Sequence, residues 1–316
     1  MSTRRIAVLG ASGFVGRYVV RDLAYEGAVI AACCRHASAA GFLRPMGDVG
    51  QIGAFSADLA DERALAAVVA GADAVVNTVG ILCERGRQRF DLAHHRGPAQ
   101  LAALAKRAGV KRFVHISALG ADPASASAYA RSKAEGEVAI RAAFPGATIL
   151  RPSLVFGPED RFFNRFGALA RYAPALPLIG GGATKFQPVY VGDVAAAVAT
   201  ALAREDTEGK TYQLGGPAVF TLKQLFELIL HVTSRKRLLV PVPFGLASLE
   251  AFFLEWAPNP LLTRDQVRML RHDSVVAPGA AGLAELGILP EALELVLPSY
   301  LDRYRRAGRS DRPSPA

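Results

Sequence analysis

The sequence predicts an α/β protein in which a doubly wound parallel sheet is joined to a smaller, mostly helical C-terminal lobe. Three observations predict this fold class. Short apolar runs typical of buried strands alternate with amphipathic helical stretches over the first half of the chain. A glycine-rich turn joins the first strand to the first helix. Beyond residue 158 the alternation weakens, and prolines divide the chain into short segments.

The alternation gives six strands in the first half of the chain. We expect strands at 4–10, 28–35, 50–59, 73–80, 110–117 and 147–158, and helices at 14–26, 62–71, about 91–108 and about 128–143. Successive parallel strands joined by such helices form right-handed crossovers that cover both faces of a sheet. The architecture is therefore of the Rossmann type, with a core over residues 1–157 that a strand–helix–strand segment at about 187–216 rejoins.

The remaining chain is expected to form the second lobe. This lobe comprises residues 158–186 and 217–302, where helical stretches alternate with loops rich in glycine and proline. Residues 303–316 are polar, basic and proline-bearing, so disorder is expected there.

One segment of the second lobe is strongly apolar. Residues 242–262 carry a stripe that includes Phe252, Phe253 and Trp256. Such a stripe more often packs in the core of a helical lobe. The alternative is a docking face for a membrane-proximal partner or for lipid headgroups, and burial of all three aromatic side chains would weaken that alternative.

Composition excludes several classes of protein. The 316 residues carry a net charge of +9, but no basic helix is interleaved with exposed aromatics, so no nucleic-acid partner is expected. The three cysteines and six histidines show no disulfide or metal-ligand spacing, so no metal is expected. No apolar stretch reaches the roughly 18 residues of a membrane span. Met1 leads directly into a strand without an apolar signal region, which predicts a cytoplasmic location.

The glycine-rich turn predicts a dinucleotide site. Gly10 allows the tight turn, Gly13 lets backbone amides approach a pyrophosphate, and Gly16 permits close packing of helix on sheet. The anion lies at the positive end of the helix. The other candidate contacts in this turn are Ser12, Phe14 and Val15.

The end of the second strand indicates which dinucleotide is bound. An acidic residue there would hold the ribose 2′-hydroxyl of NAD, but the strand ends in Arg35, whose guanidinium suits a 2′-phosphate. NADPH is therefore expected, with NADP preferred over NAD. Asp58, followed by Leu59, either meets the adenine edge or caps a helix near Asp61.

These motifs resemble the extended short-chain dehydrogenase/reductase superfamily. The resemblance rests on the glycine spacing, on Tyr129-x-x-x-Lys133 and on "RPSLVFGP" after the sixth strand, and it covers roughly residues 4–300. It implies cofactor contacts from the residues at the ends of the fourth, fifth and sixth strands, namely Val79, Gly80, Ser117, Pro152 and Val155, and from Tyr129 and Lys133.

In an active member the tyrosine transfers a proton, and the lysine holds the nicotinamide ribose and lowers the pKa of the phenol. A cation about 4 Å away could supply the roughly 4 kcal/mol that a phenol pKa near 7 requires. Such a member also needs a hydroxyl to polarise the substrate carbonyl, and the matching position here is Leu119, two residues after Ser117. Ser125 and Ser127 could substitute only if their loop folds inward.

A second departure concerns the position where the superfamily often has an active-site asparagine, which is His94 here. This histidine could replace the asparagine as a relay, although partial exposure beside His95 and Arg96 is the simpler expectation. If the site is active, the catalytic candidates are Tyr129, Lys133 and Ser117; otherwise the cofactor half of the site is intact and the substrate half is degraded.

Longer segments resemble one subgroup. "GPEDRFFNRF" (157–166), "FQPVYVGDVA" (186–195), "YQLGGP" (212–217) and "LLTRDQVRML" (261–270) are similar to the Rossmann-type accessory subunit of respiratory complex I and its bacterial relatives. The resemblance implies a structural, tightly held NADPH and little or no turnover. It also implies attachment to peripheral-arm subunits of NADH:ubiquinone oxidoreductase near the membrane surface, on the cytoplasmic face of an inner membrane.

Two other functions remain open. One is an NAD(P)-dependent reductase, epimerase or dehydratase that acts on a sugar nucleotide, a hydroxysteroid-like compound or a quinone. The other is an NADPH-sensing regulator, which would share the degraded substrate half of the site.

Overall fold

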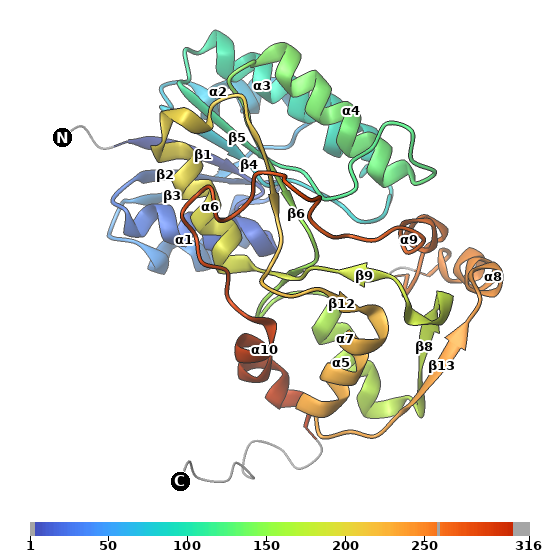
Figure 1. Ribbon diagram of the computed structural model, residues 1–316. Coiled ribbons are helices and arrows are strands. Elements are labelled where there is room, and N and C mark those ends of the chain that lie inside the picture. Colours follow the sequence, from blue (N-terminus) through green and yellow to red (C-terminus); the bar gives the residue numbers. More distant parts are fainter. Residues whose placement is uncertain (1–3, 258–259, 306–316) are drawn as a thin grey trace, which may run out of the picture. The chain divides into compact units, whose positions relative to one another are not determined.

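The computed structural model describes residues 4–257 and 260–305, and these divide into two units (Figure 1). The first unit runs to Pro152 and also takes in Val191–Leu214 and Ala277–Leu289. The second unit comprises Ser153–Tyr190, Gly215–Val276 and the chain from Pro290 onward. The expected disordered tail lies outside the described residues from 306 onward.

A seven-stranded parallel sheet forms the centre of the first unit. Its strands are β1 (Arg5–Leu9), β2 (Val29–Cys34), β3 (Ile52–Ser56), β4 (Ala74–Asn77), β5 (Arg112–Ile116), β6 (Thr148–Pro152) and β11 (Thr211–Leu214). They lie in the order β11-β6-β5-β4-β1-β2-β3, and every neighbouring pair is parallel. The predicted doubly wound fold is confirmed. The strand order reverses between β1 and β4, and ligands bind at the carboxyl ends of strands beside such a reversal.

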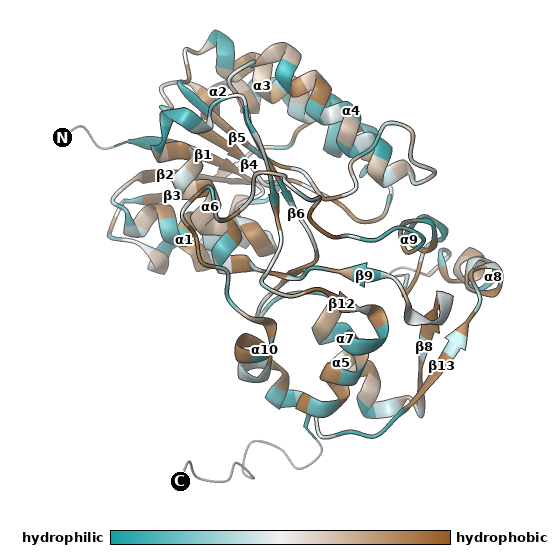
Figure 2. Cartoon of the chain, viewed as in Figure 1, coloured by the Kyte–Doolittle hydropathy of each residue, from teal (hydrophilic) through white to brown (hydrophobic). Residues whose placement is uncertain are grey.

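Helices cover both faces of this sheet, as Figure 1 shows. On one face lie α1 (Phe14–Tyr25) and α6 (Val191–Ala203), and on the other lie α2 (Glu62–Val69), α3 (Gly97–Arg107) and α4 (Ala128–Ala143). Figure 2 shows hydrophobic residues concentrated in the strands around β1, which are buried from both sides. This core holds the carboxyl ends of the strands in fixed register.

Two elements of the first unit differ from the sequence expectation. A 3-10 segment, η1 (Ala37–Met46), follows β2 where no helix was predicted. The helix expected at about 91–108 begins as a π-helical turn, η2 (Asp91–Arg96), and continues as α3. Periodic apolar residues do not distinguish a π turn from an α turn, and π turns are frequent at functional sites.

The second unit contains helices and short strand pairs. Helices α5 (Phe162–Tyr172), α7 (Leu222–Val232) and α10 (Leu293–Leu301) enclose one apolar cluster. Three strand pairs accompany them: β7 (Val155–Phe156) with β10 (Val189–Tyr190), β9 (Lys185–Phe186) with β12 (Phe220–Thr221), and β8 (Ala175–Ile179) with β13 (Leu238–Val242). Two further helices are α8 (Phe244–Leu254) and α9 (Arg264–Met269), and short 3-10 turns are η3 (Gly180–Gly182), η4 (Glu205–Thr207, in the first unit) and η5 (Asp302–Tyr304).

The mostly helical structure expected for residues 217–306 is interrupted at two places in the described part of that range. Residues 238–242 form strand β13, and no helix lies between α9 and α10. Prolines at 241 and 243 favour the extended conformation of β13. Prolines and glycines recur between residues 278 and 290, where each of them disfavours a helix.

The expectation that the apolar stripe at 242–262 packs in a core is wrong for Phe252, Phe253 and Trp256, which are exposed. Only Ala247 and Ala251 are buried within α8. Phe253 is 66% exposed and Trp256 is 83% exposed. Val242 is buried in a small apolar cluster with Ala247 and Ala251, and Phe244 and Leu262 pack against this cluster. Phe253 and Trp256 do not belong to it.

Candidate functional site

The glycine turn has the geometry that a dinucleotide site requires. Gly10 follows β1 with φ at +80°, and a Cβ there would lie 2.7 Å from the Thr78 hydroxyl. A Cβ on Gly16 would collide with the Gly10 carbonyl oxygen. Both positions therefore require glycine, and together they bring the start of α1 against the end of β1.

The amino terminus of α1 can accept an anion. Gly13 is its N-cap and supplies no side-chain cap, and the first turn contains no acidic residue. Ser12, Phe14 and Val15 are partly exposed around this turn. Backbone N–H groups at such a helix end bind phosphate, aided by the helix dipole. The protein's own residues thus fit a pyrophosphate at this position.

Arg17 adds positive charge to the turn and was missed in the sequence. Its Nε donates to the Gly13 carbonyl at 3.2 Å, and its Nη2 donates to the Ser12 carbonyl at 3.3 Å. An arginine directly after the third glycine of the motif is the signal that could have identified it.

Arg35 lies exposed just beyond the end of β2, as a 2′-phosphate contact requires. Its guanidinium donates to the side-chain amide oxygen of Gln88 (Nη2, 3.3 Å). Asp58 is also exposed, and among the bonds described its side chain accepts only a local one, from the Ala60 amide at 2.9 Å. The cap of α2 is Asp61, which accepts from the Ala64 amide at 3.0 Å. Asp58 therefore does not cap α2, and its contact with adenine stays a prediction.

The other predicted cofactor contacts are spread along the sheet edge. Val79 and Gly80 follow β4, and the Val79 amide donates to the Asn77 side chain at 3.1 Å. Leu59 follows β3 and is buried in the apolar core of the first unit, and Pro152 ends β6. Val155 belongs to β7 in the second unit. Their contacts with a nucleotide stay predictions.

Tyr129 and Lys133 lie one turn apart on α4, and both are buried. The Lys133 Nζ donates to the Ile116 carbonyl at 3.1 Å. Burial lowers the pKa of Lys133 to about 8, against the opposing effect of Glu137. Burial raises the pKa of Tyr129 to about 12. The protein alone therefore does not give the lowered phenol pKa that an active reductase would use.

The hydroxyl of Ser117 is bonded to a carboxylate. Ser117 is buried at the end of β5, and its Oγ donates to Glu137 Oε1. The same carboxylate accepts two bonds from Arg151, from Nε at 2.9 Å and from Nη2 at 2.5 Å. A hydroxyl donated to a carboxylate is not available to polarise a substrate carbonyl.

The other candidates for the missing hydroxyl have structural partners as well. Leu119, which the resemblance places at the position of that donor, has an apolar side chain, and its backbone amide donates to the Pro152 carbonyl at 2.9 Å. The Ser127 hydroxyl caps α4 by accepting from the Ala130 amide at 3.3 Å. The Ser125 hydroxyl accepts from the Ser127 amide at 3.2 Å.

The expectation that His94 is partly exposed is wrong. His94 is fully buried on η2, and its ring stacks on Phe90 and meets the edge of Tyr129. Its Nε2 accepts from the Ile81 amide at 3.1 Å, and its Nδ1 lies 2.9 Å from Ser132 Oγ. Burial lowers the pKa of His94 to about 2.

A second buried histidine, His115, was missed in the sequence. His115 on β5 lies opposite Asn77 on β4, whose amide nitrogen is 3.1 Å from His115 Nδ1. Among the described residues, His115 Nε2 is the buried side-chain atom that lacks a hydrogen-bond partner. Burial and the charge of Lys133 lower the pKa of His115. A histidine in the middle of an apolar strand is the signal in the sequence.

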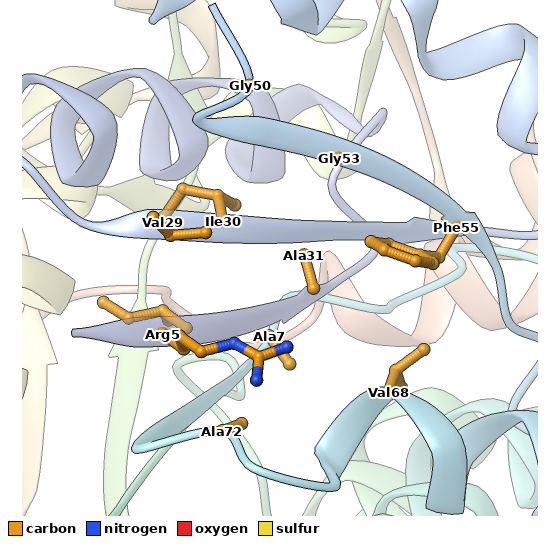
Figure 3. Close-up of a pocket in the computed structure, with 11 residues that line it drawn as sticks. Arg5, Ala7, Val29, Ile30, Ala31, Gly50, Gly53, Phe55, Val68 and Ala72 are labelled. Atoms are coloured by element: carbon orange, nitrogen blue, oxygen red, sulfur yellow. The ribbon is translucent and has the colours of Figure 1, made fainter. Parts of the chain in front are cut away.

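A small hollow in the sheet lies away from these residues. It measures about 150 Å³ and is lined by Arg5, Ala31, Phe55 and Val68 among others (Figure 3). Its lining includes Arg5, which begins β1, but no residue of the glycine turn, which follows the carboxyl end of β1. It is therefore not the nucleotide site.

The sequence matches the NAD dependent epimerase/dehydratase family over residues 6–215. The chain belongs to this family. The matched segment contains the glycine turn, Tyr129 and Lys133, and the contacts of these residues with a nucleotide stay predictions. Neither a cluster of metal-binding side chains nor a helix long and apolar enough to cross a bilayer occurs within residues 4–257 and 260–305.

Comparisons with individual proteins add relatives of two kinds. The chain is 38% identical to "NADH dehydrogenase [ubiquinone] 1 alpha subcomplex subunit 9, mitochondrial" of Arabidopsis thaliana, over 95% of the chain and 78% of that protein. It is 35% identical to a ceramide reductase of Caulobacter vibrioides, over 60% of the chain and 58% of that protein. The structure of Citrobacter triphenylmethane reductase with NADP(H) shares the fold, with a TM-score of 0.74 and 22% identity, over 94% of the chain and 99% of the reductase.

Proposed function

We propose that the protein is an accessory subunit of NADH:ubiquinone oxidoreductase, respiratory complex I, that holds NADPH without turning it over. The observation that carries the proposal is the contrast within the site. The glycine turn, Tyr129 and Lys133 keep the arrangement of a nucleotide site, whereas Leu119 stands where a hydroxyl would polarise a substrate. The Arabidopsis relative, a named subunit similar over nearly the whole chain, supports the same conclusion.

The nucleotide we propose is NADPH in preference to NADH. Its pyrophosphate would lie against the amino terminus of α1, and its 2′-phosphate would pair with Arg35. Lys133 would donate to the nicotinamide ribose. When bound, such a nucleotide supplies hydride chemistry, but in this subunit we assign it a structural role because the site presents no donor to activate an acceptor.

The exposed apolar side chains around α8 are the contact surface that we assign to the complex. This α8 face consists of Leu246, Leu249, Phe252, Phe253 and Trp256, which are 41–83% exposed. Exposed apolar patches of this kind mark interaction sites. Arg264 lies 5.1 Å from the Phe252 ring and pairs with Glu255 at 2.9 Å, which gives the patch a charged rim. We propose that peripheral-arm subunits cover this face, at the cytoplasmic surface of the membrane.

Native purification tests the function. Membranes are solubilised in mild detergent, the complexes are separated, and the nucleotide retained by this protein is identified. We expect comigration with subunits of the quinone-reducing complex and bound NADPH that is not oxidised by added quinone, sugar nucleotide or hydroxysteroid. A free, soluble protein that oxidises NADPH with any of these compounds would overturn the proposal.

A paired substitution tests the contact surface. In Phe253→Ser/Trp256→Ser, comigration with the complex should be lost while NADPH binding is retained. Tyr172→Ser, at an aromatic residue of the same unit that is 80% exposed, is the matched control and should comigrate normally. If the unsubstituted protein bound protein-free liposomes as well as it binds the complex, lipid would be the occupant of the α8 face. That result would contradict the assignment to partner subunits.

A further inference from the structure

His94 connects three parts of the first unit through its ring. Its Nε2 accepts from the amide of Ile81, just after the Val79–Gly80 segment at the end of β4. Its Nδ1 lies 2.9 Å from the Ser132 hydroxyl, which donates to the Tyr129 carbonyl at 2.8 Å. One fully buried side chain thus joins the chain after β4 to the turn of α4 that carries Tyr129.

The direction of these bonds fixes the tautomer of the ring. An amide N–H can only donate, so Nε2 is the unprotonated nitrogen and the proton lies on Nδ1. Nδ1–H therefore donates to Ser132, whose own proton is donated to the Tyr129 carbonyl. Because both ring nitrogens are engaged, His94 cannot relay protons without breaking one of these bonds.

The backbone is shaped to bring His94 to this place. Residue 94 lies in the π-helical turn η2, which packs on α4. At the contact, α4 has Gly136, where a Cβ would collide with the His94 carbonyl oxygen. The His94 ring points toward Gly80, where a Cβ would come to 3.5 Å from Lys133 Nζ and 3.9 Å from His94 Nε2. Because Gly80 has no side chain, the space beside Lys133 Nζ and the His94 ring stays open.

We propose that His94 is a positioning residue for the nicotinamide half of the nucleotide. It sets the path of the chain at Gly80 and Ile81 and, through Ser132, the turn of α4 that presents Tyr129 and Lys133. The adenosine half, held by the glycine turn and Arg35, does not depend on it. This inference rests on the proposed binding of NADPH.

The experiment compares two ligands on the purified full-length protein. NADPH fills both halves of the site, whereas 2′,5′-ADP fills only the adenosine half. In His94→Ala the Kd for NADPH should rise about tenfold, the effect of losing one buried hydrogen-bonded connection, while the Kd for 2′,5′-ADP stays unchanged. In His94→Gln, whose amide can accept from Ile81 and donate to Ser132, NADPH affinity should recover.

Two further variants keep the test decisive. Ser132→Ala removes the second half of the connection and should show the same ligand-selective loss, even if His94→Ala does not fold. His95→Ala, at the half-exposed neighbour paired with Asp91, is the control and should bind both ligands normally.

Equal weakening of both ligands in His94→Ala and Ser132→Ala would overturn the inference, since it would indicate a general loss of structure. Unchanged NADPH affinity in His94→Ala would also overturn the inference, and so would a failure of His94→Gln to restore the affinity. Failure of the unsubstituted protein to bind NADPH would instead contradict the proposed function, so the two failures are distinguishable.

Discussion

At the scale of single residues, the ammonium of Lys133 is the group of the site whose charge depends most on ordinary pH. The groups around it are Tyr129 and Glu137 on α4, His94 on η2 and His115 on β5. Both histidines have lowered pKa values and are neutral, so Glu137 is the anion that opposes the effect of burial. With a pKa of about 8, Lys133 loses its charge at pH values only slightly above neutral.

Nucleotide affinity should therefore fall as pH rises. A protonated Lys133 donates to the ribose and attracts the anionic nucleotide, so binding favours the charged form. Above about pH 8 the Kd for NADPH should increase by up to about tenfold per pH unit, as expected for uptake of one proton. Calorimetric titrations between pH 7 and 9.5 measure this slope. Lys133→Met should bind more weakly but without the slope, and a flat profile in the unsubstituted protein would contradict the assignment.

The stability of the protein without nucleotide should change in the opposite direction. The folded pKa of Lys133 is lowered from 10.5 to about 8, so between these values the unfolded chain binds more protons and stability rises with pH. Above pH 10 stability should fall as pH rises, because the pKa of Tyr129 is raised in the folded state and the phenol of the unfolded chain ionises first. Denaturation from pH 7 to 10 measures the free energy of unfolding of the unsubstituted protein and of Lys133→Met. The difference between the two free energies should shrink as pH rises.

Glu137 is a second residue with a large expected effect. Its carboxylate is buried and holds both Arg151 and the Ser117 hydroxyl. Removing one partner of such a pair leaves a charge without compensation, so Glu137→Ala should lower the free energy of unfolding by about 3 kcal/mol. Glu135→Ala, at an exposed position two residues earlier on the same helix, is the control and should change it little. Urea denaturation compares the two variants.

The sequence predicted the members of this site that depend on local spacing. Three glycines at a strand–helix junction and a tyrosine four residues before a lysine on one helix both fix geometry within a few residues. The partners of these groups depend on other elements. Asn77 meets His115 through the register of β4 with β5, and Glu137 reaches Ser117 across 20 residues of chain. The burial of His94 was not predictable either. Its polar sequence neighbours suggested an exposed ring, but the ring is buried.

At the scale of elements, the contact between η2 and α4 depends on a single glycine. Replacing Gly136 by alanine should favour α4 by up to about 1 kcal/mol on intrinsic helix propensity. The added Cβ, however, would collide with the backbone of His94, which cannot yield without moving η2. We therefore expect Gly136→Ala to destabilise the protein by about 2 kcal/mol in thermal or chemical denaturation.

Gly245 supplies the matched comparison for that prediction. It lies in α8, and a Cβ there would meet nothing within 4 Å. Gly245→Ala should therefore stabilise the protein or leave its stability unchanged. If both alanine variants gave the same sign, helix propensity rather than the contact with η2 would govern position 136.

Element boundaries were predictable where the apolar pattern is long and were not where tertiary packing sets them. The expected strand at 147–158 was one apolar run, but β6 ends at Pro152 and β7 covers only Val155–Phe156. Four strands of the second unit, β7, β9, β10 and β12, have two residues each and are too short to leave a periodic pattern. The exposed α8 face was the least predictable feature, because an apolar helix reads the same whether a core or a partner covers it.

At the scale of the whole molecule, the fold is that of the epimerase/dehydratase family, and the proposed lack of turnover rests on a few side chains. The seven-stranded sheet and the glycine turn are properties of the family and carry no information about turnover. The functional distinction rests on Leu119, on the bonded Ser117 hydroxyl and on the α8 face. For this reason the fold was predictable from the sequence as a whole, whereas the proposed role depends on individual positions.

A structural role for the nucleotide predicts a large effect on the stability of the folded protein. A ligand that binds only the folded state adds about 4 kcal/mol to the free energy of unfolding at a thousand times its Kd. The melting temperature of the nucleotide-free protein should rise with added NADPH, and by less with the same concentration of NADH.

Two glycine variants test whether these shifts come from the glycine turn. Gly16→Val, whose side chain would collide with the Gly10 carbonyl, should abolish both shifts. Gly41→Ala, where a Cβ meets nothing within 4 Å, should retain them. Equal shifts with NADPH and NADH would contradict the role assigned to Arg35, and an unchanged melting temperature with either would contradict a stabilising nucleotide altogether.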